Sequence, residues 1–127
     1  MDFQLEADFI LPVPMHPSKV RSRGFNQAEV MARPLSKKLG IPIARDMVKR
    51  VKKTLPQSGL SAFSREQNLQ GAFVYNVKKY GTGAKTVIII DDIFTSGATM
   101  NACASVLIQN GLPAPECLSL SIAVKIL

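Results

Sequence analysis

The sequence lacks tryptophan and has few of the residues that build disulfide frameworks or metal sites. It contains two cysteines and one histidine in 127 residues. Cys103 and Cys117 do not share a metal-ligand spacing, and a disulfide framework is not expected. We predict that both are reduced residues of the core, Cys103 in a helix and Cys117 in a strand, as is usual for free cysteines in a cytosolic protein.

Long apolar runs, internal repeats and low-complexity segments are also missing. No apolar stretch approaches the ~18 residues of a membrane-spanning helix. The acidic, unpatterned start of the chain is not typical of a signal peptide. With an apolar fraction of 46%, the 127 residues suffice for one core but not for two. The sequence therefore predicts a single cytoplasmic domain without a membrane span.

Acidic residues are scarce relative to basic ones, 9 against 16, which gives a formal charge of +7. This balance favours an anionic partner such as nucleic acid, pyrophosphate or a phosphorylated sugar. A solvated basic surface explains lysines such as Lys78, Lys79 and Lys85 equally well. Single-stranded DNA is less favoured than the other anions, because an aromatic content of 6% offers few stacking platforms.

The chain alternates between strand and helix patterns. Strands are predicted at residues 9–14, within 43–51, and at 73–75, 87–90 and 117–124, and the main helices at 26–39 and 100–110. Residues 15–24 are predicted to form a basic loop. Pro34 is expected to kink or split its helix, since it cannot donate a backbone hydrogen bond. Ser61 or Ser64 is expected to cap a short helix. Short connections between such elements favour a mainly parallel sheet flanked by helices, an α/β fold.

Residues 87–99, VIIIDDIFTSGAT, carry the strongest functional signal. Branched aliphatic residues predict a strand buried on both faces, and Asp91 and Asp92 stand at its carboxyl end. A hydroxyl- and glycine-rich turn follows, and then a helix begins. Ligands of open α/β sheets bind at this edge, and a helix N-terminus favours anions. The segment therefore predicts a phosphate in the turn and polyol hydroxyls on the carboxylates, although Asp91 and Asp92 are also compatible with a plain strand end. The turn lacks the Gly-Lys-Ser/Thr ending of a Walker phosphate loop.

This segment resembles the phosphoribosyl-pyrophosphate motif of the type I phosphoribosyltransferases. Further motifs narrow the resemblance to the ComF (competence protein F) branch: PVPMHP at 12–17, RGFNQA at 23–28, PQSGLS at 56–61 and NLQGAF at 68–73. The resemblance implies a type I phosphoribosyltransferase-like fold over residues 1–127, as a single domain with no large hood. Members of the branch usually carry a zinc-ribbon region before the first strand. We expect this region to be absent here, either because the chain is a short homologue or because it is truncated.

Residue roles follow from the resemblance by position. Asp91 and Asp92 would be the catalytic residues, and they would contact the ribose 2′- and 3′-hydroxyls directly or through a divalent ion. Mg²⁺ suits such a site because it needs few protein ligands beside a diphosphate. The 5′-phosphate would be bound by the turn that consists of Thr95, Ser96, Gly97, Ala98 and Thr99.

Two basic segments would serve the pyrophosphate. The first follows the first strand and contains His16 and Arg23. For His16 a structural role is the alternative, and Asn26 after this segment is either a contact or only a helix cap. The second segment, residues 49–61, resembles the flexible loop that closes over substrate in this superfamily, with Arg50 and Lys53 as pyrophosphate ligands.

Two functions of different classes remain open from the sequence. The first is an enzyme that binds phosphoribosyl pyrophosphate with Mg²⁺ and transfers the phosphoribosyl group to an unidentified acceptor, with release of pyrophosphate. The second is a non-catalytic module that binds phosphoribosyl pyrophosphate or handles single-stranded DNA, as the competence association of the family suggests. A homodimer is compatible with either function.

Overall fold

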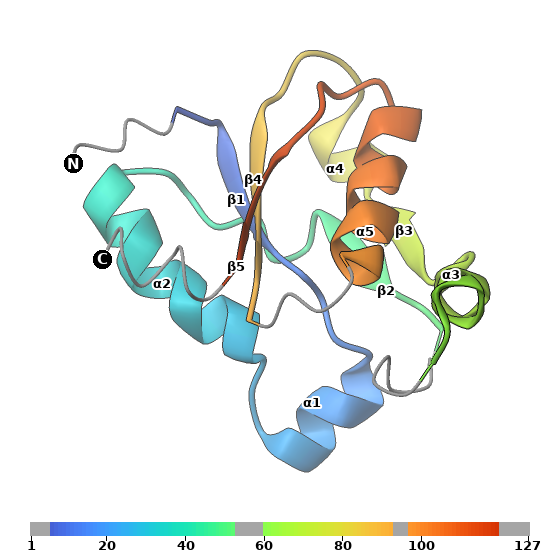
Figure 1. Cartoon of the computed structure of the whole chain (residues 1–127). Helices are drawn as coiled ribbons and strands as arrows, with labels where there is room; N and C mark the ends of the chain where they lie inside the picture. Colours follow the sequence, from blue (N-terminus) through green and yellow to red (C-terminus); the bar gives the residue numbers. More distant parts are fainter. Residues whose placement is uncertain (1–5, 53–59, 93–96, 120–127) are drawn as a thin grey trace.

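The computed structural model describes residues 6–52, 60–92 and 97–119. Its centre is a parallel sheet of three strands in the order β1-β4-β5 (Figure 1). These strands are β1 (Phe9–Pro12), β4 (Val87–Asp91) and β5 (Glu116–Ser119). In the register, Phe9 pairs with Val87, and Asp91 pairs with Ser119. The predicted parallel sheet is therefore confirmed, with the aliphatic strand β4 in the middle.

Helices cover both faces of this sheet. Because side chains alternate along a strand, Ile88 and Ile90 point to one face and Ile89 to the other. Ile88 and Ile90 pack with Leu35 of α2 (Gln27–Leu39), whereas Ile89 packs with Leu107 of α5 (Ala98–Gln109). All five of these side chains are fully buried. The single domain thus has two core layers, one on each side of β4.

A second, antiparallel pair of strands stands apart from the main sheet. It consists of β2 (Val48–Arg50) and β3 (Phe73–Tyr75), with α3 (Ala62–Leu69) between them and α4 (Val77–Tyr80) after them. The strand predicted within 43–51 and the strand at 73–75 are confirmed. Ser61 is the cap of α3, because its hydroxyl accepts a hydrogen bond from the Ser64 amide.

The predicted basic loop at residues 15–24 is wrong, because the chain forms helix α1 (Pro17–Arg23) there. His16 caps this helix, with its ring Nδ1 accepting from the Ser18 amide at 3.2 Å. Pro17 occupies the first helical position, where its missing N–H costs nothing. Gly24 ends the helix in a left-handed conformation with φ of 92°. These local signals outweigh the density of exposed charges that suggested a loop.

Other boundaries differ from the predictions in smaller ways. Pro34 lies inside α2 without splitting it; its ring is on the exposed side of the helix. Helix α5 begins at Ala98, two residues before the predicted start. Cys103 is a free, buried thiol as predicted, but Cys117 is exposed. Cys117 was wrongly placed in the core because β5 is the last strand of the described sheet and is covered less than β4.

Candidate functional site

Asp91 and Asp92 lie where strand β4 ends, at the carboxyl edge of the parallel sheet. Asp91 is the last residue of β4, and the amide of Asp92 donates a hydrogen bond of 2.9 Å to the Asp91 Oδ1. Both side chains are half-buried. The structure therefore places the two carboxylates side by side at the edge where ligands of parallel sheets bind.

The pKa of Asp91 is raised to about 7, chiefly because burial disfavours its charged form. The side-chain hydrogen bond with Asp92 and the negative charge of Asp92 add to this effect. The positive charge of Arg50 acts in the opposite direction. Carboxyl groups with such raised pKa values are typical of functional sites, since a bound ligand or cation can stabilise the ionised form that the fold itself stabilises poorly.

Arg50 comes from the separate strand pair, yet its charge acts on Asp91. Burial lowers the pKa of the Arg50 guanidinium, and the negative charge of Asp91 raises it. The guanidinium carbon lies 5.3 Å from the centroid of the Phe73 ring, a cation–π distance. The structure thus brings Arg50 and Asp91 together at one site, although they lie in different sheets.

Helix α5 follows Asp91 and Asp92 in the chain. Its N-cap is Gly97, which is buried and has a left-handed backbone with φ of 78°. The first turn, which includes Ala98 and Thr99, holds no acidic residue. The amides at such a helix start favour an anion. Thr95 and Ser96 in the predicted phosphate turn, and Lys53 in the second basic segment, lie outside the described residues.

Helix α1 places the first basic segment. In Figure 1 it lies below the lower ends of β1 and β4, where Asp91 and Asp92 are found. Arg23 is in the last turn of α1 and is exposed. His16 has a structural role as the cap, in which its Nδ1 and the Ser18 hydroxyl are 2.8 Å apart.

Asn26 connects the start of α2 to the end of β1. Its Oδ1 accepts from the Ala28 amide at 3.0 Å, and its Nδ2 donates to the Val13 carbonyl at 3.1 Å. Val13 in turn donates its amide to the Ile90 carbonyl in β4. Asn26 is therefore a helix cap, and both ends of its amide are used within the protein.

The segment at 49–61, predicted to close over substrate, begins in strand β2 and ends at the cap of α3. Lys49 and Arg50 belong to strand β2, and Ser61 caps α3. These terminal residues are the ones predicted to end a strand and to cap a short helix, and closure of the segment over substrate stays a prediction. The segment between them, at 53–59, lies outside the described residues.

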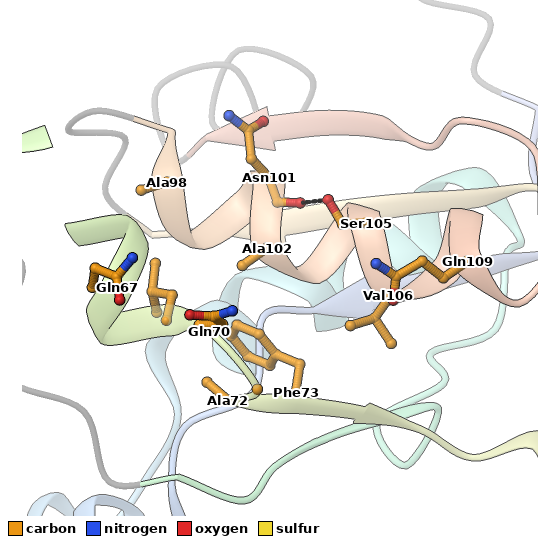
Figure 2. A pocket seen from close by; sticks show the side chains of 12 residues that line it. Gln67, Gln70, Ala72, Phe73, Ala98, Asn101, Ala102, Ser105, Val106 and Gln109 are labelled. Carbon is orange, nitrogen blue, oxygen red and sulfur yellow. Dashed lines mark hydrogen bonds between the residues drawn. The ribbon is translucent and has the colours of Figure 1, made fainter. Parts of the chain in front are cut away.

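A cavity of about 680 Å³ adjoins this site (Figure 2). It lies between α3, the start of β3 and one side of α5, and it extends to Ala98 at the start of α5. Its polar lining is uncharged, with Gln67 and Gln70 on one wall and Asn101 on the other. Phe73 belongs to the lining as well. Neither this cavity nor the contact between Phe73 and Arg50 was predicted, since both depend on how β2 and β3 pair.

The comparison with protein families gives a decisive match. The family model described as "Phosphoribosyl transferase domain" matches residues 25–124. The chain belongs to this family. The match includes Asp91, Asp92 and the start of α5, and the parallel sheet flanked by helices agrees with the fold that the resemblance implied. The type I phosphoribosyltransferase fold class is thereby confirmed.

Curated relatives of this phosphoribosyl transferase domain confirm the resemblance to the ComF branch. Competence protein F of Haemophilus influenzae is 41% identical over 103 residues, which cover 81% of this chain and 45% of that protein. DNA utilization protein YhgH of Escherichia coli K12 is 35% identical over 109 residues, covering 86% and 47%. Competence protein ComFC of Bacillus subtilis is 27% identical over 102 residues, covering 80% and 39%. The chain thus spans less than half the length of these relatives.

The described residues also bear on metal binding and on membrane insertion. Within residues 6–52, 60–92 and 97–119, no three His, Cys, Asp or Glu side chains are grouped so that they alone would bind a metal ion. Across the same ranges, no helix has both the length and the apolar character needed to cross a bilayer.

Proposed function

We propose that this domain binds phosphoribosyl pyrophosphate together with Mg²⁺ and transfers the phosphoribosyl group to an acceptor, with release of pyrophosphate. The observation that carries this proposal is the convergence of two carboxylates, one arginine and a glycine-capped helix start at the carboxyl edge of the sheet. This set of groups offers separate partners for hydroxyls, for a cation and for phosphates.

The donor parts are assigned by chemistry. Asp91 and Asp92 would accept hydrogen bonds from the ribose 2′- and 3′-hydroxyls, directly or through the cation. The start of α5 at Gly97, Ala98 and Thr99, with Thr95 and Ser96 before it, would bind the 5′-phosphate through amides and hydroxyls. Arg50 would face the pyrophosphate, with Lys53 and Arg23 as further cationic partners.

Charge development explains why these residues would promote transfer. When the bond between C1 of the ribose and the pyrophosphate oxygen breaks, positive charge grows on the ring and negative charge on the leaving group. The carboxylates of Asp91 and Asp92 stabilise the first, and Arg50 stabilises the second. The electron pair of the broken bond leaves with pyrophosphate, and the acceptor's lone pair forms the new bond to C1.

The carboxylates fit Mg²⁺ as its protein partners. Adjacent carboxylates supply hard oxygen ligands, and the described residues form no closed cage of three or more ligating side chains. Mg²⁺ would lower the charge on the diphosphate and so assist its departure. The pKa of Asp91 fits the same role, because a nearby cation lowers the cost of its ionised form.

A second candidate function is a non-catalytic module that binds phosphoribosyl pyrophosphate or handles single-stranded DNA. It is favoured by two observations: the charge of +7 and the printed names of the relatives, which refer to competence and DNA utilization. In that case Asp91, Asp92 and the start of α5 would bind the ligand without turnover.

Binding and turnover measurements test the proposal. Isothermal titration of the chain with phosphoribosyl pyrophosphate should give saturable binding that strengthens with Mg²⁺ and weakens at least tenfold in Asp92→Asn. Pyrophosphate release is then followed with a panel of nitrogenous bases and ammonia. Binding without release for any acceptor would favour the non-catalytic module, and the absence of binding would refute the assignment of the donor site. A steep loss of DNA affinity with added salt would support the electrostatic part of DNA handling.

A further inference from the structure

Phe73 is buried against Arg50, whose charge acts on Asp91. In the antiparallel pair of β2 and β3, Arg50 is the register partner of Phe73, and Lys49 is the partner of Val74. Side chains of directly opposed residues lie on the same face of such a pair. Phe73 is 6% exposed, whereas Val74 is 51% exposed. The pair therefore directs Arg50 and Phe73 inward and directs Lys49 and Val74 to solvent.

The contact between these two inward side chains has the geometry of a cation–π interaction. The guanidinium carbon lies 5.3 Å from the ring centroid, and the ring is largely removed from water. An arginine side chain has many rotamers, so a ring face that binds its guanidinium reduces the conformations that must be excluded when a ligand arrives. The charge of Arg50 is felt by Asp91 in this arrangement.

We propose that Phe73 is a positioning residue: its ring holds the Arg50 guanidinium at the Asp91 site, where the pyrophosphate group of the donor binds. This inference rests on the proposed function, and it adds a residue that contacts none of the reacting atoms. Figure 2 shows Phe73 among the residues that line the cavity, which extends to Ala98 at the start of α5. The ring therefore forms part of the wall between the strand pair and α5.

The test is a double-mutant cycle on ligand binding. The variants are Phe73→Leu, Arg50→Gln and the combination of both, each titrated with phosphoribosyl pyrophosphate and with ribose 5-phosphate in the presence of Mg²⁺. Phe73→Leu should raise the Kd for phosphoribosyl pyrophosphate about fivefold to tenfold, since a desolvated cation–π contact is of that size. It should leave the Kd for ribose 5-phosphate unchanged, because that ligand has no pyrophosphate for Arg50.

The cycle separates positioning from loss of folding. In the Arg50→Gln background, Phe73→Leu should have no further effect on phosphoribosyl pyrophosphate. Phe73→Tyr, which keeps the ring, should bind as the parent does. If Phe73→Leu folds poorly, Phe73→Met takes its place in the cycle, with the same expected loss of affinity. Tyr75→Leu is the matched control: it removes a buried ring from the same strand and face, but Tyr75 pairs with Val48 and not with Arg50.

Two results would overturn the inference while leaving the proposed function intact. One is an equal loss of affinity for both ligands in Phe73→Leu, and the other is an undiminished effect of Phe73→Leu when Arg50 is already glutamine. If the parent chain binds neither ligand, the proposed function fails and the positioning role fails with it.

Discussion

Arg50 and Arg23 received the same predicted role, yet the structure gives them different surroundings. Arg50 is half-buried, lies over the Phe73 ring and acts on the charge of Asp91. Arg23 is exposed in the last turn of the seven-residue helix α1. One arginine is therefore oriented by its neighbours before any ligand binds, and the other retains the freedom of a surface side chain.

This difference in surroundings indicates which of the two charges contributes more to pyrophosphate binding. An exposed arginine loses side-chain entropy when it meets a phosphate, and its attraction is screened by salt. A half-buried arginine in fixed surroundings has already lost part of that entropy on folding, and its charge acts across a lower dielectric. We therefore expect Arg50 to dominate pyrophosphate binding and Arg23 to contribute mainly long-range attraction.

The largest effect is expected from Arg50→Gln. Loss of a charge-assisted contact of about 1.5–3 kcal/mol should raise the Kd for phosphoribosyl pyrophosphate about tenfold to a hundredfold. Titration calorimetry at constant pH measures it. The matched control is Lys49→Gln, which removes a positive charge from the adjacent, exposed residue of β2. Equal effects of the two substitutions would remove the distinction between an oriented and a solvated charge.

The next largest effect is expected from Asp91→Asn and concerns how the free energy of unfolding depends on pH. The pKa of Asp91 is raised from 3.8 to about 7 in the folded chain. The folded state therefore binds more protons than the unfolded state between these values, and the free energy of unfolding falls as pH rises through this window. Asp91→Asn should flatten that dependence and stabilise the protein by about 1–2 kcal/mol at pH 8, allowing for solvent screening.

Urea denaturation at several pH values measures this dependence, with Asp8→Asn as the control at an exposed carboxylate. An unchanged slope in Asp91→Asn would show that the burial of Asp91 is not costly. The same titration predicts that donor binding strengthens between pH 6 and 8, because the ionised carboxylate is the form that binds a cation.

Local sequence patterns predicted strand β4 and the start of α5 better than they predicted the orientation of Arg50. The aliphatic run, the aspartates and the glycine turn predicted β4, its buried position and the start of α5 within two residues. The inward direction of Arg50 depends on the register between β2 and β3, in which Arg50 pairs with Phe73, 23 positions later in the sequence. Short strands of three residues carry too little periodicity to predict that register.

In the α1 region, the sequence contained local helix signals that the prediction missed. Its cations suggested a loop, although His16, Pro17 and Gly24 form the cap, the first position and the end of a short helix. A cap histidine is uncommon, so the start signal was missed. Asn26, by contrast, was recognised as a possible cap, and its second hydrogen bond to Val13 was not, because that bond joins residues brought together only by the fold.

A smaller effect, on the free energy of unfolding, is expected from Asn26→Ala at the start of α2. Loss of the α2 cap and of the bond to Val13 should lower the free energy of unfolding by about 1–2 kcal/mol, with little change in donor affinity for the folded protein. Chemical denaturation and calorimetry measure the two quantities. Asn26→Asp keeps a capping oxygen and should recover part of the stability. A large loss of affinity at unchanged stability would instead identify Asn26 as a ligand contact.

The smallest effect is expected from Arg23→Gln, a change in Kd of about twofold at 0.15 M salt. Its signature is the salt dependence: the difference from the parent should grow at low ionic strength and vanish near 1 M, since an exposed charge is screened. Arg50→Gln should retain most of its effect at high salt. Identical salt profiles for the two variants would contradict the assignment of one charge to the site interior and the other to its surface.

The most direct test of the central claim is a crystal structure of the chain with phosphoribosyl pyrophosphate and Mg²⁺. We expect the 5′-phosphate at Gly97, Ala98 and Thr99, at the start of α5, and the ribose hydroxyls and the cation at Asp91 and Asp92. We expect the pyrophosphate within hydrogen-bonding distance of an Arg50 guanidinium that still lies on the Phe73 ring. A ligand bound elsewhere, or an Arg50 turned away from its pyrophosphate, would contradict it.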